Sequence, residues 1–546
     1  MLISVLIAIF VNHNISFMIL TEIDIDFLAK KGISAAEVED QMAKISKGVN
    51  MPNILRTASL DDGILILNDA ERETLIARWD AYLAKKPSVV HFVPASGRAN
   101  RFLRNLHNFL KSDKTEPTTN FEKNFFKHLP SFAFYNELNK FFMALDKKDV
   151  QELLEEKKYK RIVEYMLTEK GLNYLTYPVA MFKFHTDKSK RFVSIQKYLP
   201  KKIQKYYASF EDTRTPIQET LIECAMLSGK NKEVNVCFTV NEEHKEMIQD
   251  YIRDFMLPIE KKLGVNFSVV LQIQSHSTDT VLLTKTGFPC RNEHGQLLLK
   301  QAGHGALLEN LNSLKNDFVF IKNIDNQAPD IQKKQVVEYR KMMGGFLLKI
   351  QKYISKFIKL LEKGDVPDDQ LIEIINFVEN VLNVKRDKIL LMPREEQYEY
   401  LKSKLNRPIR ICGMVKNEEE NGGMPCWVKN ADGTVSLQIV DYYQIVGNAD
   451  YEKQFIASTH FNPVDMVCCI TDYKGRRFDL TKYSNPEEYM LVPKQTNGQE
   501  TTKLERAGLW NGGMSDWNTI FVEIPIKNFN PVKRINDLLR HEHQNI

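Results

Sequence analysis

The stretch HFVPASGRANRFLR, residues 91–104, passes from a buried-strand pattern into small residues and then into arginines. The residues around its start, SVVHFV, are apolar enough for a strand inside a sheet, whereas RANRFLRNLHNFL has helical spacing. Phe102, Leu106, Phe109 and Leu110 share one face of that helix. The ASGRA segment between the two patterns is therefore predicted to be a strand-to-helix turn.

A turn of this kind can bind phosphate, because the first N–H groups of a helix have no internal acceptor and the helix dipole adds partial positive charge. The dipole contributes only about 0.3–1 kcal/mol at an exposed site, so side-chain cations must supplement it. Arg98, Arg101 and Arg104 follow at intervals of three residues and could hold a triphosphate. An ordinary connection with a solvated basic face explains the same residues equally well.

Later segments alternate between strand and helix patterns. Residues 233–240, 265–274 and 316–326 are strand-like, and residues 242–264 are helical. Such alternation is typical of βαβ units, so the sequence predicts an α/β fold with a mixed, mostly parallel sheet and helices on both faces. Further strand patterns follow at RPIRICGMV, at WVKNADGTVSLQIV with an Asp432-Gly433 hairpin turn, and at NTIFVEIPI.

The chain divides into an α/β part and helical additions. Residues 89–330 form one predicted α/β half, and residues 401–546 form a second. Long amphipathic patterns at residues 331–400 predict a helical insertion. Residues 18–88 are predicted to be mostly helical.

The first residues raise two separate questions. The apolar MLISVLIAIF is shorter than the ~20 residues that a membrane span needs, and residues 1–17 are a candidate misassigned extension ahead of Met18. Asp24 and Asp26 form a DID motif that is better explained by N-terminal helix capping than by metal binding.

Composition points to a globular protein without nucleic-acid or membrane partners. In 546 residues, 75 Lys and Arg nearly balance 70 Asp and Glu, and the net charge of +5 does not suggest a nucleic-acid partner. The seven cysteines are odd in number and lack CxxC spacing, so neither disulfides nor a zinc framework is expected. A reducing cytoplasm is the predicted location. The sequence leaves the oligomeric state open.

The strand DFVFIKNI delivers Asp325 at its carboxyl end, where ligands bind in open α/β sheets. A carboxylate there suits Mg²⁺, which needs few protein ligands when phosphates supply the rest. Asn323 and Asn326 could orient Asp325. A simple polar turn explains these residues as well.

The GHG segment allows two interpretations. Gly303 and Gly305 remove side-chain bulk, so a planar group could approach the backbone, but the segment could equally start a helix. His304 taken alone is more often structural than catalytic. The chain contains no GxxxxGK[ST] and no GxGxxG after a strand, which disfavours a P-loop ATPase and a dinucleotide dehydrogenase.

Together these motifs resemble the nucleotidyltransferases of the glycosyltransferase A superfamily, especially the UDP-sugar pyrophosphorylases. PASGRANR is similar to their Gly-rich turn, GHG to a second motif, and NIDN to their NxDN strand end, in the same order. From Met18 onward the chain also resembles a bacterial family described as a domain of unknown function (four-three-zero-one) in that superfamily. RTPIQETLIE, RPIRICGMVKNEEENGGMPCWV, LWNGGMSDWNTIFVE and FNPVKRINDLL carry this second resemblance.

The resemblance implies a glycosyltransferase A-like fold and Mg²⁺-dependent transfer of a nucleotidyl group from a nucleoside triphosphate to a sugar 1-phosphate. It implies that residues 89–330 are the nucleotide-binding half and that residues 401–546 are the sugar-phosphate side. Arg101, Arg104 and Asp325 are the implied catalytic residues, and Asp325 also holds the metal. The implied nucleotide-binding residues are Ala95, Ser96, Gly97, Arg98, Gln274, Gly303, His304 and Gly305. The implied sugar-phosphate-binding residues are Arg407, Arg410, Lys416 and Lys494, and Asp516 and Asn518 are candidates for the second metal ligand. Taken singly, each of the four cations is also explained by a solvated charge on a surface strand.

Departures from the superfamily pattern keep an alternative open. Ala99 and Asn100 stand where relatives usually have Gly-Thr, and Val179 stands at an expected lysine position. If that lysine compensates the charge of the sugar phosphate, catalysis requires a substitute such as Lys183 or Arg98. A non-catalytic protein that binds or senses a nucleotide or sugar phosphate is therefore the alternative to an enzyme.

Overall fold

The computed structural model describes residues 20–97, 99–186, 213–229, 232–418, 422–496 and 498–544. The candidate extension at residues 1–17 and Arg98 lie outside the described residues. Every other predicted site residue lies within these ranges.

A nine-stranded mixed sheet forms the centre of the molecule, with β15 paired to one side of the ordered path β2-β19-β12-β16-β10-β3-β6-β7. All neighbours on this path are parallel except those that involve β16, which confirms the predicted mostly parallel α/β architecture. The strands are β2 (Ile64–Leu65), β3 (Val89–Pro94), β6 (Glu233–Val240), β7 (Asn266–Ile273), β10 (Phe318–Lys322), β12 (Ile409–Lys416), β15 (His460–Phe461), β16 (Asp465–Cys469) and β19 (Asn518–Glu523).

The central strands are buried on both faces, which explains their continuous apolar sequences. Every residue of β10, FVFIK, is buried, and so is every residue of β3 except Pro94. Alternate residues of β10 face different cores: Phe318 and Phe320 pack on one side, and Val319 and Ile321 on the other.

Helices cover the first face of the sheet. On the Phe320 side lie α4 (Asp69–Leu83) and α15 (Asp330–Lys363), and Trp79 of α4 packs its ring 5.4 Å from that of Phe320. Gly344 and Gly345 allow this close packing, since a Cβ on Gly345 would come within 1.9 Å of the Leu75 carbonyl oxygen. The helices α12 (Pro216–Ser228) and α13 (Glu242–Leu263) cover the β3-β6-β7 end.

The opposite face packs against α14 (Leu307–Asn312) and a second, antiparallel sheet. The predicted helices on both faces are thus confirmed. The second sheet has the order β1-β13-β14-β11, with β1 (Ile54–Thr57), β11 (Val384–Lys385), β13 (Met424–Lys429) and β14 (Val435–Val440). The Asp432-Gly433 turn joins β13 to β14 as expected, with Gly433 at φ +81°.

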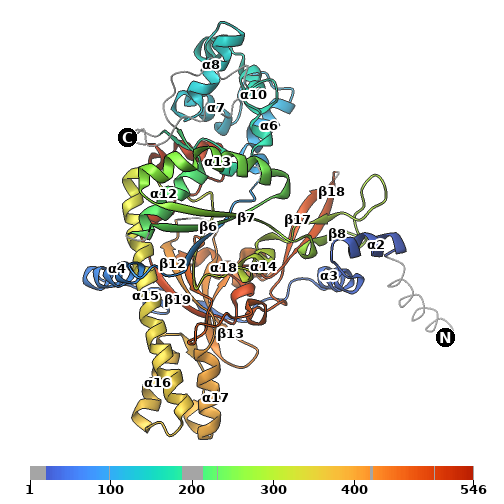
Figure 1. The fold of residues 1–546 in the computed structure, drawn as a ribbon. Helices are drawn as coiled ribbons and strands as arrows, with labels where there is room; N and C mark the ends of the chain where they lie inside the picture. The colour runs from blue at the N-terminus through green and yellow to red at the C-terminus, as the bar shows by residue number, and fades with distance from the viewer. Residues whose placement is uncertain are drawn as a thin grey trace, which may run out of the picture.

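A separate group of small helices follows the strand-to-helix turn. Its members are α5 (Ala99–Phe102), α6 (Arg104–Lys111), α7 (Asn120–Lys127), α8 (Tyr135–Leu145), α9 (Val150–Glu155) and α10 (Tyr159–Leu167). They enclose a core of their own, to which Val532, Ile535 and Leu538 near the end of the chain contribute. Figure 1 shows this helical layer standing beyond α12 and α13, on the far side of the molecule from α16 and α17. Sequence patterns had assigned these residues to the nucleotide-binding half, and the separate layer was not predicted.

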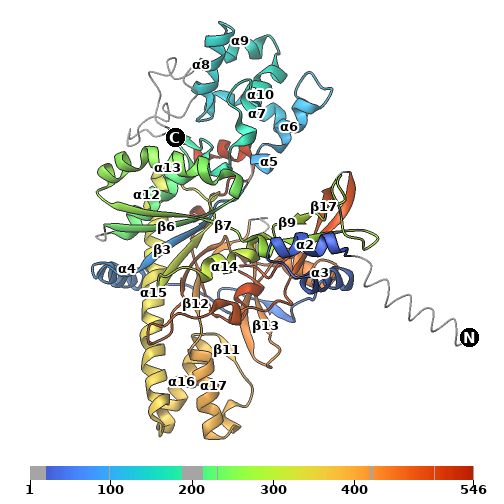
Figure 2. The same cartoon turned by 45° about the vertical axis from the view of Figure 1, so that its right-hand side comes forward.

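The predicted insertion at 331–400 contains α15, α16 (Asp368–Asn380) and α17 (Arg394–Leu405), and α15 alone spans 34 residues. Figure 2 shows α16 and α17 beside the distal half of α15, projecting from the sheet.

A smaller antiparallel sheet lies at one side of the molecule, beside the N-terminal helices (Figure 2). It has the order β17-β18-β8-β9, with β8 (Thr280–Thr284), β9 (Leu299–Lys300), β17 (Met490–Thr496) and β18 (Gln499–Glu505). The helices α2 (Glu22–Lys30) and α3 (Ala35–Lys47) pack against it. Asp24 belongs to a capping box with Thr21 and pairs with Arg291, in agreement with the capping interpretation.

All seven cysteines are free and buried, as expected for a chain without disulfides. Among the described helices none combines the length and hydropathy that crossing a membrane requires.

Candidate functional site

The turn after β3 is fixed from three sides by main-chain contacts. The Ala95 N–H donates to the carbonyl of Thr239 at 2.8 Å, the Ile324 N–H donates to Pro94 at 3.2 Å, and the Val179 N–H donates to Gly97 at 3.2 Å. These bonds tie the turn to β6, to the end of β10 and to a short helical segment at Val179–Met181. The described part of the predicted turn, residues 95–97, is therefore bonded to three neighbouring segments.

Gly97 faces open space rather than neighbouring atoms. Apart from its chain neighbours, no heavy atom of the described residues would lie within 4 Å of a Cβ added there, and the residue is not in the left-handed region of φ. The fold therefore does not require glycine at position 97. A bare backbone on this side of the turn is what a closely approaching ligand needs.

The helix after the turn differs from the expected one. The predicted single helix is broken at Leu103 into α5, which is one turn long, and α6, so a helix dipole adds little positive charge here. Phe102, Leu106 and Phe109 are buried as predicted. Arg101 and Arg104 are exposed on the other side, and neither is in an ion pair with another described residue.

Asp325 faces these arginines across a pocket of about 460 Å³. The strands explain the juxtaposition, because Ile321 of β10 is level with Phe92 of β3, and four residues further on the two chains reach Asp325 and Ser96. The pocket is lined by Pro94, Ser96, Gly97, Arg101, Phe102, Arg104, Val179, Asn323, Ile324, Asp325, Val532 and Lys533. We call it the carboxyl-edge pocket.

The electrostatics of the pocket are dominated by cations around one carboxylate. Burial raises the pKa of Asp325, and the positive charges of Lys533 and Arg101 oppose this shift. Asp325 is the single carboxylate among the described residues of the lining, beside three cationic side chains. Such a lining suits an anionic ligand.

Lys533 was not predicted from the sequence, although it lies in the quoted motif FNPVKRINDLL. The segment around it runs beside the end of β10: the Val532 N–H donates to the Asp325 carbonyl at 2.9 Å, and the Asn530 N–H donates to Asn326 Oδ1 at 2.9 Å. Asn326 is thus buried and holds the C-terminal segment rather than orienting Asp325. The sequence signal that could have identified Lys533 is a lysine within a motif that carries the family resemblance.

Val179 lies in the pocket lining, and Lys183 does not compensate for it. Lys183 is buried, and its ammonium group lies 2.5 Å from Glu137, away from the lining. The described residue that supplies a third positive charge to the pocket is Lys533.

The lining fits a magnesium ion that receives most of its ligands from phosphate. Asp325 offers a carboxylate that no other described side chain binds, and the amide of Asn323 lies in the same lining. No group of three or more His, Cys, Asp or Glu side chains suitable for a metal occurs among the described residues. A magnesium ion in this pocket would therefore take most of its oxygen ligands from a bound phosphate.

Lys494 of β17 extends the positive charge beyond the pocket lining. Loss of solvent contact lowers the pKa of Lys494, as do the charges of Lys503, Arg101 and Arg104, whereas Glu505 opposes the shift. These side chains come from segments nearly 400 residues apart, yet their charges interact. Of the predicted sugar-phosphate residues, Lys494 is the one brought towards Arg101 and Arg104.

The GHG segment begins a helix, which corrects the interpretation that its glycines leave room for a ligand. A Cβ on Gly303, at φ +73°, would come within 2.3 Å of Glu505 Oε2, and one on Gly305 within 2.3 Å of the Arg506 carbonyl oxygen. Both glycines therefore serve packing against the end of β18. The segment forms η6 (Gly303–Ala306) ahead of α14.

His304 stacks on Trp510 with ring centres 3.5 Å apart. Burial lowers the pKa of His304 to about 4, so the ring is neutral at pH 7 and its Nδ1 accepts the Leu509 N–H at 3.2 Å. This bonding supports a structural role for His304.

A hydrogen-bonded chain connects the segment before GHG to the strand-to-helix turn. Asn241, which follows β6, donates to the Ser96 carbonyl at 2.9 Å, and Gln301 donates to Asn241 Oδ1 at 3.2 Å. Gln274 follows β7 on the same edge and donates to Thr278. Because β7 is the third strand from β10, Gln274 is separated laterally from Asp325 by roughly 14 Å.

Four predicted site residues lie at the opposite edge of the sheet. Cys412 of β12 is level with Ile321 of β10, so Arg407 lies five residues before that level and Asp325 four after it, roughly 30 Å apart at 3.3 Å per residue. The predicted grouping with Asp325 is therefore wrong for Arg407, Arg410, Asp516 and Asn518.

The bonding of these residues agrees with their position. Arg407 pairs with Asp516 and donates to Asn518 Oδ1 at 2.8 Å, so Asp516 and Asn518 bind an arginine and do not share a metal ion with Asp325. Arg410 is fully buried and donates to Thr519 and to the Trp510 carbonyl. Lys416, at the end of β12, lies on the Asp325 edge but outside the pocket lining.

Comparison with known proteins places the chain in a family. A family model described as Domain of unknown function (DUF4301) matches residues 21–199 and 196–544. The chain belongs to this family. No curated protein matches the DUF4301 chain.

Among solved structures, the DUF4301 chain is similar to UDP-glucose pyrophosphorylases. A point mutant of the Leishmania major enzyme has 10% identity and a TM-score of 0.41, with 94% of this chain and 77% of that chain covered. The Trypanosoma brucei UDP-glucose phosphorylase has 12% identity and a TM-score of 0.44 over the same shares. A second Leishmania major mutant, solved with UDP-glucose, has 11% identity and a TM-score of 0.40, with 92% and 73% covered. At these values the likeness does not transfer an activity to this chain.

Proposed function

We propose that this protein is a sugar-phosphate nucleotidyltransferase, which converts a nucleoside triphosphate and a sugar 1-phosphate into a nucleotide sugar and pyrophosphate. One observation carries the proposal: Arg101, Arg104 and Lys533 line the carboxyl-edge pocket together with Asp325, beside the open backbone of Gly97. A polyphosphate supplies the negative charge that this lining lacks.

In the proposed reaction a phosphate oxygen of the sugar 1-phosphate attacks the α-phosphorus, and the bond to the β-phosphate oxygen breaks as pyrophosphate leaves. Arg101 and Arg104 bind the leaving pyrophosphate and stabilise its developing charge. Lys533, from the opposite wall, binds the phosphoryl group that is transferred. The Gly97 backbone allows the phosphates to approach without a side chain in the way.

Asp325 and Asn323 would hold a magnesium ion, which supplies further neutralisation of phosphate charge. Burial favours the protonated form of Asp325, so binding of a cation competes with binding of a proton there. No covalent nucleophile of the protein is required, because positioning and charge neutralisation suffice for this class of reaction.

The direct test is pyrophosphate release from a panel of nucleoside triphosphates and sugar 1-phosphates with Mg²⁺. We expect one pair to be turned over, and we expect Lys533→Ala to reduce kcat/KM by about 10²-fold, as is usual for loss of one charge-stabilising group. The exposed Lys527→Ala is the matched control. Absence of turnover by a folded protein across the whole panel would contradict the proposal.

The second candidate is a protein that binds the same ligands without turning them over, and Val179 in the pocket lining favours it. It predicts that triphosphate with Mg²⁺ raises the melting temperature although no pyrophosphate appears, since ligand bound by the native state alone stabilises it. Melting curves and pyrophosphate release, measured on the same material, therefore separate the two candidates.

A further inference from the structure

Two buried histidines meet where the C-terminal part of the chain reaches α12. His185 belongs to β4 (His185–Thr186), and His543 belongs to the short helix η13 (His541–His543). Nε2 of His185 lies 3.1 Å from Nδ1 of His543, and the two rings stack with their centres 5.4 Å apart. Exposure is only 2% for His185 and 3% for His543. We call these two residues the histidine pair.

Charged side chains from three elements surround His185. Its Nδ1 lies 2.7 Å from Glu219 of α12, and the other oxygen of Glu219 accepts from Lys333 of α15 at 2.8 Å. Arg214, in β5 (Thr213–Arg214), lies 3.3 Å from Glu219 and donates to Asp330 at the start of α15 at 2.9 Å. Glu219 is therefore already compensated by two cations, and little of its negative charge remains for a second histidine.

A proton added to His543 in this position would have no acceptor. Its Nδ1 already faces His185, and its Nε2 is buried without a hydrogen-bond partner among the described residues. Loss of solvent contact lowers the pKa of His543 to about 2, as do the charges of His185 and Arg540, whereas Glu219 opposes the shift. His543 is therefore neutral while it is docked, and it takes up a proton only after it leaves the pair.

Residues 531–544, which we call the C-terminal unit, carry both His543 and the pocket residue Lys533. The Lys533 N–H donates to Asp537 at 2.8 Å, and the Arg540 side chain donates to the Pro531 carbonyl. These bonds join the part of the unit beside η13 to the part that lines the carboxyl-edge pocket. A change at the histidine pair is thus transmitted to the pocket wall within one unit.

We propose that the histidine pair is an acid-sensitive latch, in which uptake of a proton by His543 releases the C-terminal unit from α12 and loosens the wall of the carboxyl-edge pocket. Because released His543 binds a proton and docked His543 does not, docking has its full strength above the ordinary histidine pKa of about 6.5 and weakens as pH falls below it. Each pH unit below that value favours the released state about tenfold. The latch does not depend on the proposed function; only a resulting loss of triphosphate affinity does.

Hydrogen exchange of the full chain without ligand, at about pH 7.5 and about pH 5, tests the latch. After correction for the intrinsic pH dependence of exchange, we expect the protection of residues 531–544 to fall by about tenfold or more in the wild type. His543→Phe keeps a ring against His185 but cannot take up a proton, so its protection should change by less than about threefold. His541→Phe, at an exposed position of the same short helix, is the matched control and should respond as the wild type does.

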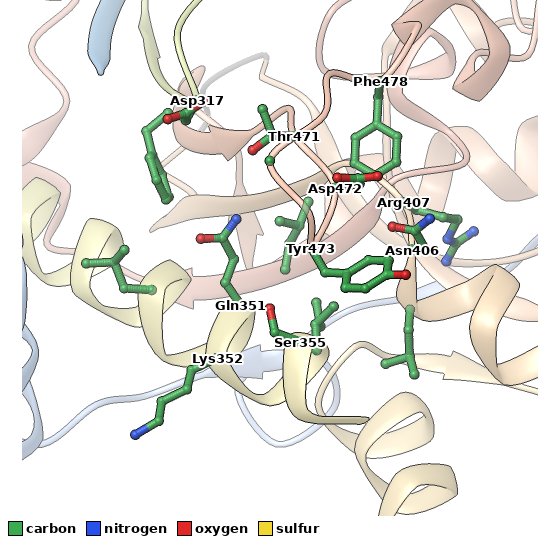
Figure 3. Close-up of a pocket in the computed structure, with 16 residues that line it drawn as sticks. Asp317, Gln351, Lys352, Ser355, Asn406, Arg407, Thr471, Asp472, Tyr473 and Phe478 are labelled. Atoms are coloured by element: carbon green, nitrogen blue, oxygen red, sulfur yellow. The ribbon is translucent and has the colours of Figure 1, made fainter. Parts of the chain in front are cut away.

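Other titrating groups do not imitate this response. Burial raises the pKa of Asp325, and also that of Asp317, which lines a pocket of about 340 Å³ at the other edge of the sheet (Figure 3). Protonation of either carboxyl group in acid favours the folded protein, which is the opposite sign. Burial lowers the pKa of His91 and of His304, which gives the same sign as His543, but both residues are present in every variant.

Two outcomes would overturn the proposal: wild-type protection of residues 531–544 that does not change with pH, or an equal fall in the wild type and in His543→Phe. His543→Gln keeps a donor for His185 and does not titrate, so it repeats the comparison should the phenylalanine disturb the fold. Pyrophosphate release plays no part in this measurement. Absence of catalysis therefore leaves the test of the latch unaffected.

Discussion

Asp325 is the residue at which stability and binding are expected to oppose each other. Burial raises the pKa of its carboxyl group despite Lys533 and Arg101, so the folded protein holds this proton more tightly than the unfolded chain does. The free energy of unfolding contributed by Asp325 therefore falls as pH rises from the unfolded to the folded pKa. At pH 7 the ionised group costs stability, which a bound cation would recover.

Asp325→Asn removes that charge and nearly preserves shape. We expect the melting temperature without ligand to stay the same or rise, and Mg²⁺-dependent triphosphate affinity to fall by about tenfold or more, as for loss of a metal ligand. Calorimetric titration and melting curves measure both quantities. A large loss of unliganded stability would instead identify Asp325 as a structural residue.

The pH dependence follows from the same shift. Because a cation competes with the proton on Asp325, affinity for triphosphate with Mg²⁺ should decline as pH falls through the raised pKa of this group. Titrations between about pH 4 and pH 8 measure this decline. A pH-independent affinity would mean that the Asp325 carboxylate does not hold the ion.

Two glycines provide a matched pair. Gly97→Ala places its Cβ more than 4 Å from every described residue other than its chain neighbours, so it should leave the melting temperature unchanged while weakening triphosphate binding. Gly303→Ala places a Cβ against Glu505 at a positive φ and should lower stability by about 1–3 kcal/mol. Denaturant unfolding and ligand titration of both variants check the contrast, and the reverse pattern would assign ligand contact to GHG.

The sequence predicted Arg101, Arg104 and Asp325 as neighbours because each follows a strand end of recognisable pattern. Lys533 could not be placed in this way, since its position depends on residues 530–532 pairing with residues 325–327 two hundred positions earlier. Arg407 and Arg410 were misplaced for a different reason: they stand at the start of a strand, and parallel strands put starts and ends at opposite edges.

At the scale of elements, α12 is fixed to the sheet by a buried ionic network. Glu223 of α12 pairs with Lys322 of β10 at 2.6 Å and with Arg340 of α15 at 2.7 Å, and Arg340 also binds Asp465 of β16. The motif RTPIQETLIE contributes Glu223 to this network. Its residues hold the helix that backs the carboxyl-edge pocket.

Glu223→Gln should destabilise the protein by about 3–5 kcal/mol, because Lys322 and Arg340 lose the charge that compensates their burial. Glu338→Gln, which breaks an exposed pair with Lys334 on α15, should change stability by less than about 0.5 kcal/mol. Urea unfolding curves compare the two. Equal effects would show that the buried network does not hold α12.

Glu223 also predicts a response to acid. Burial raises the pKa of Glu223, but Lys322 and Arg340 outweigh it and hold the pKa at about 2. The stabilisation is therefore fully present above the ordinary glutamate pKa and is lost as pH falls towards 2.

The prediction of elements succeeded where one strand or helix repeats a single period, as in 233–240 and 242–264. It failed for α5 to α10, because short helices joined by loops form a core only with one another and with Val532, Ile535 and Leu538. When a core is built from segments far apart in the chain, neither segment shows a regular hydrophobic periodicity that would reveal it.

At the scale of the whole molecule, the last residues of the described chain contribute to two structures. Val532 and Lys533 line the carboxyl-edge pocket, and Val532, Ile535 and Leu538 pack into the core of the helical layer. His185 connects the chain end to α12, since its Nδ1 lies 2.7 Å from Glu219 of α12 and its Nε2 lies 3.1 Å from His543 Nδ1. Removal of residues 531–546 should increase hydrogen exchange in α5 to α10 and abolish triphosphate binding. Lys533→Ala should weaken triphosphate binding without the exchange effect, and identical exchange in the two variants would contradict this role.

The path of residues 530–543 has a practical consequence for handling the protein. An affinity tag or fluorescent fusion placed directly after this segment would pull on the wall that carries Lys533, whereas one attached ahead of α2 would emerge beside the small antiparallel sheet. Assays on material with the first arrangement would therefore underreport binding, and a cleavable leader at the other end is the appropriate design.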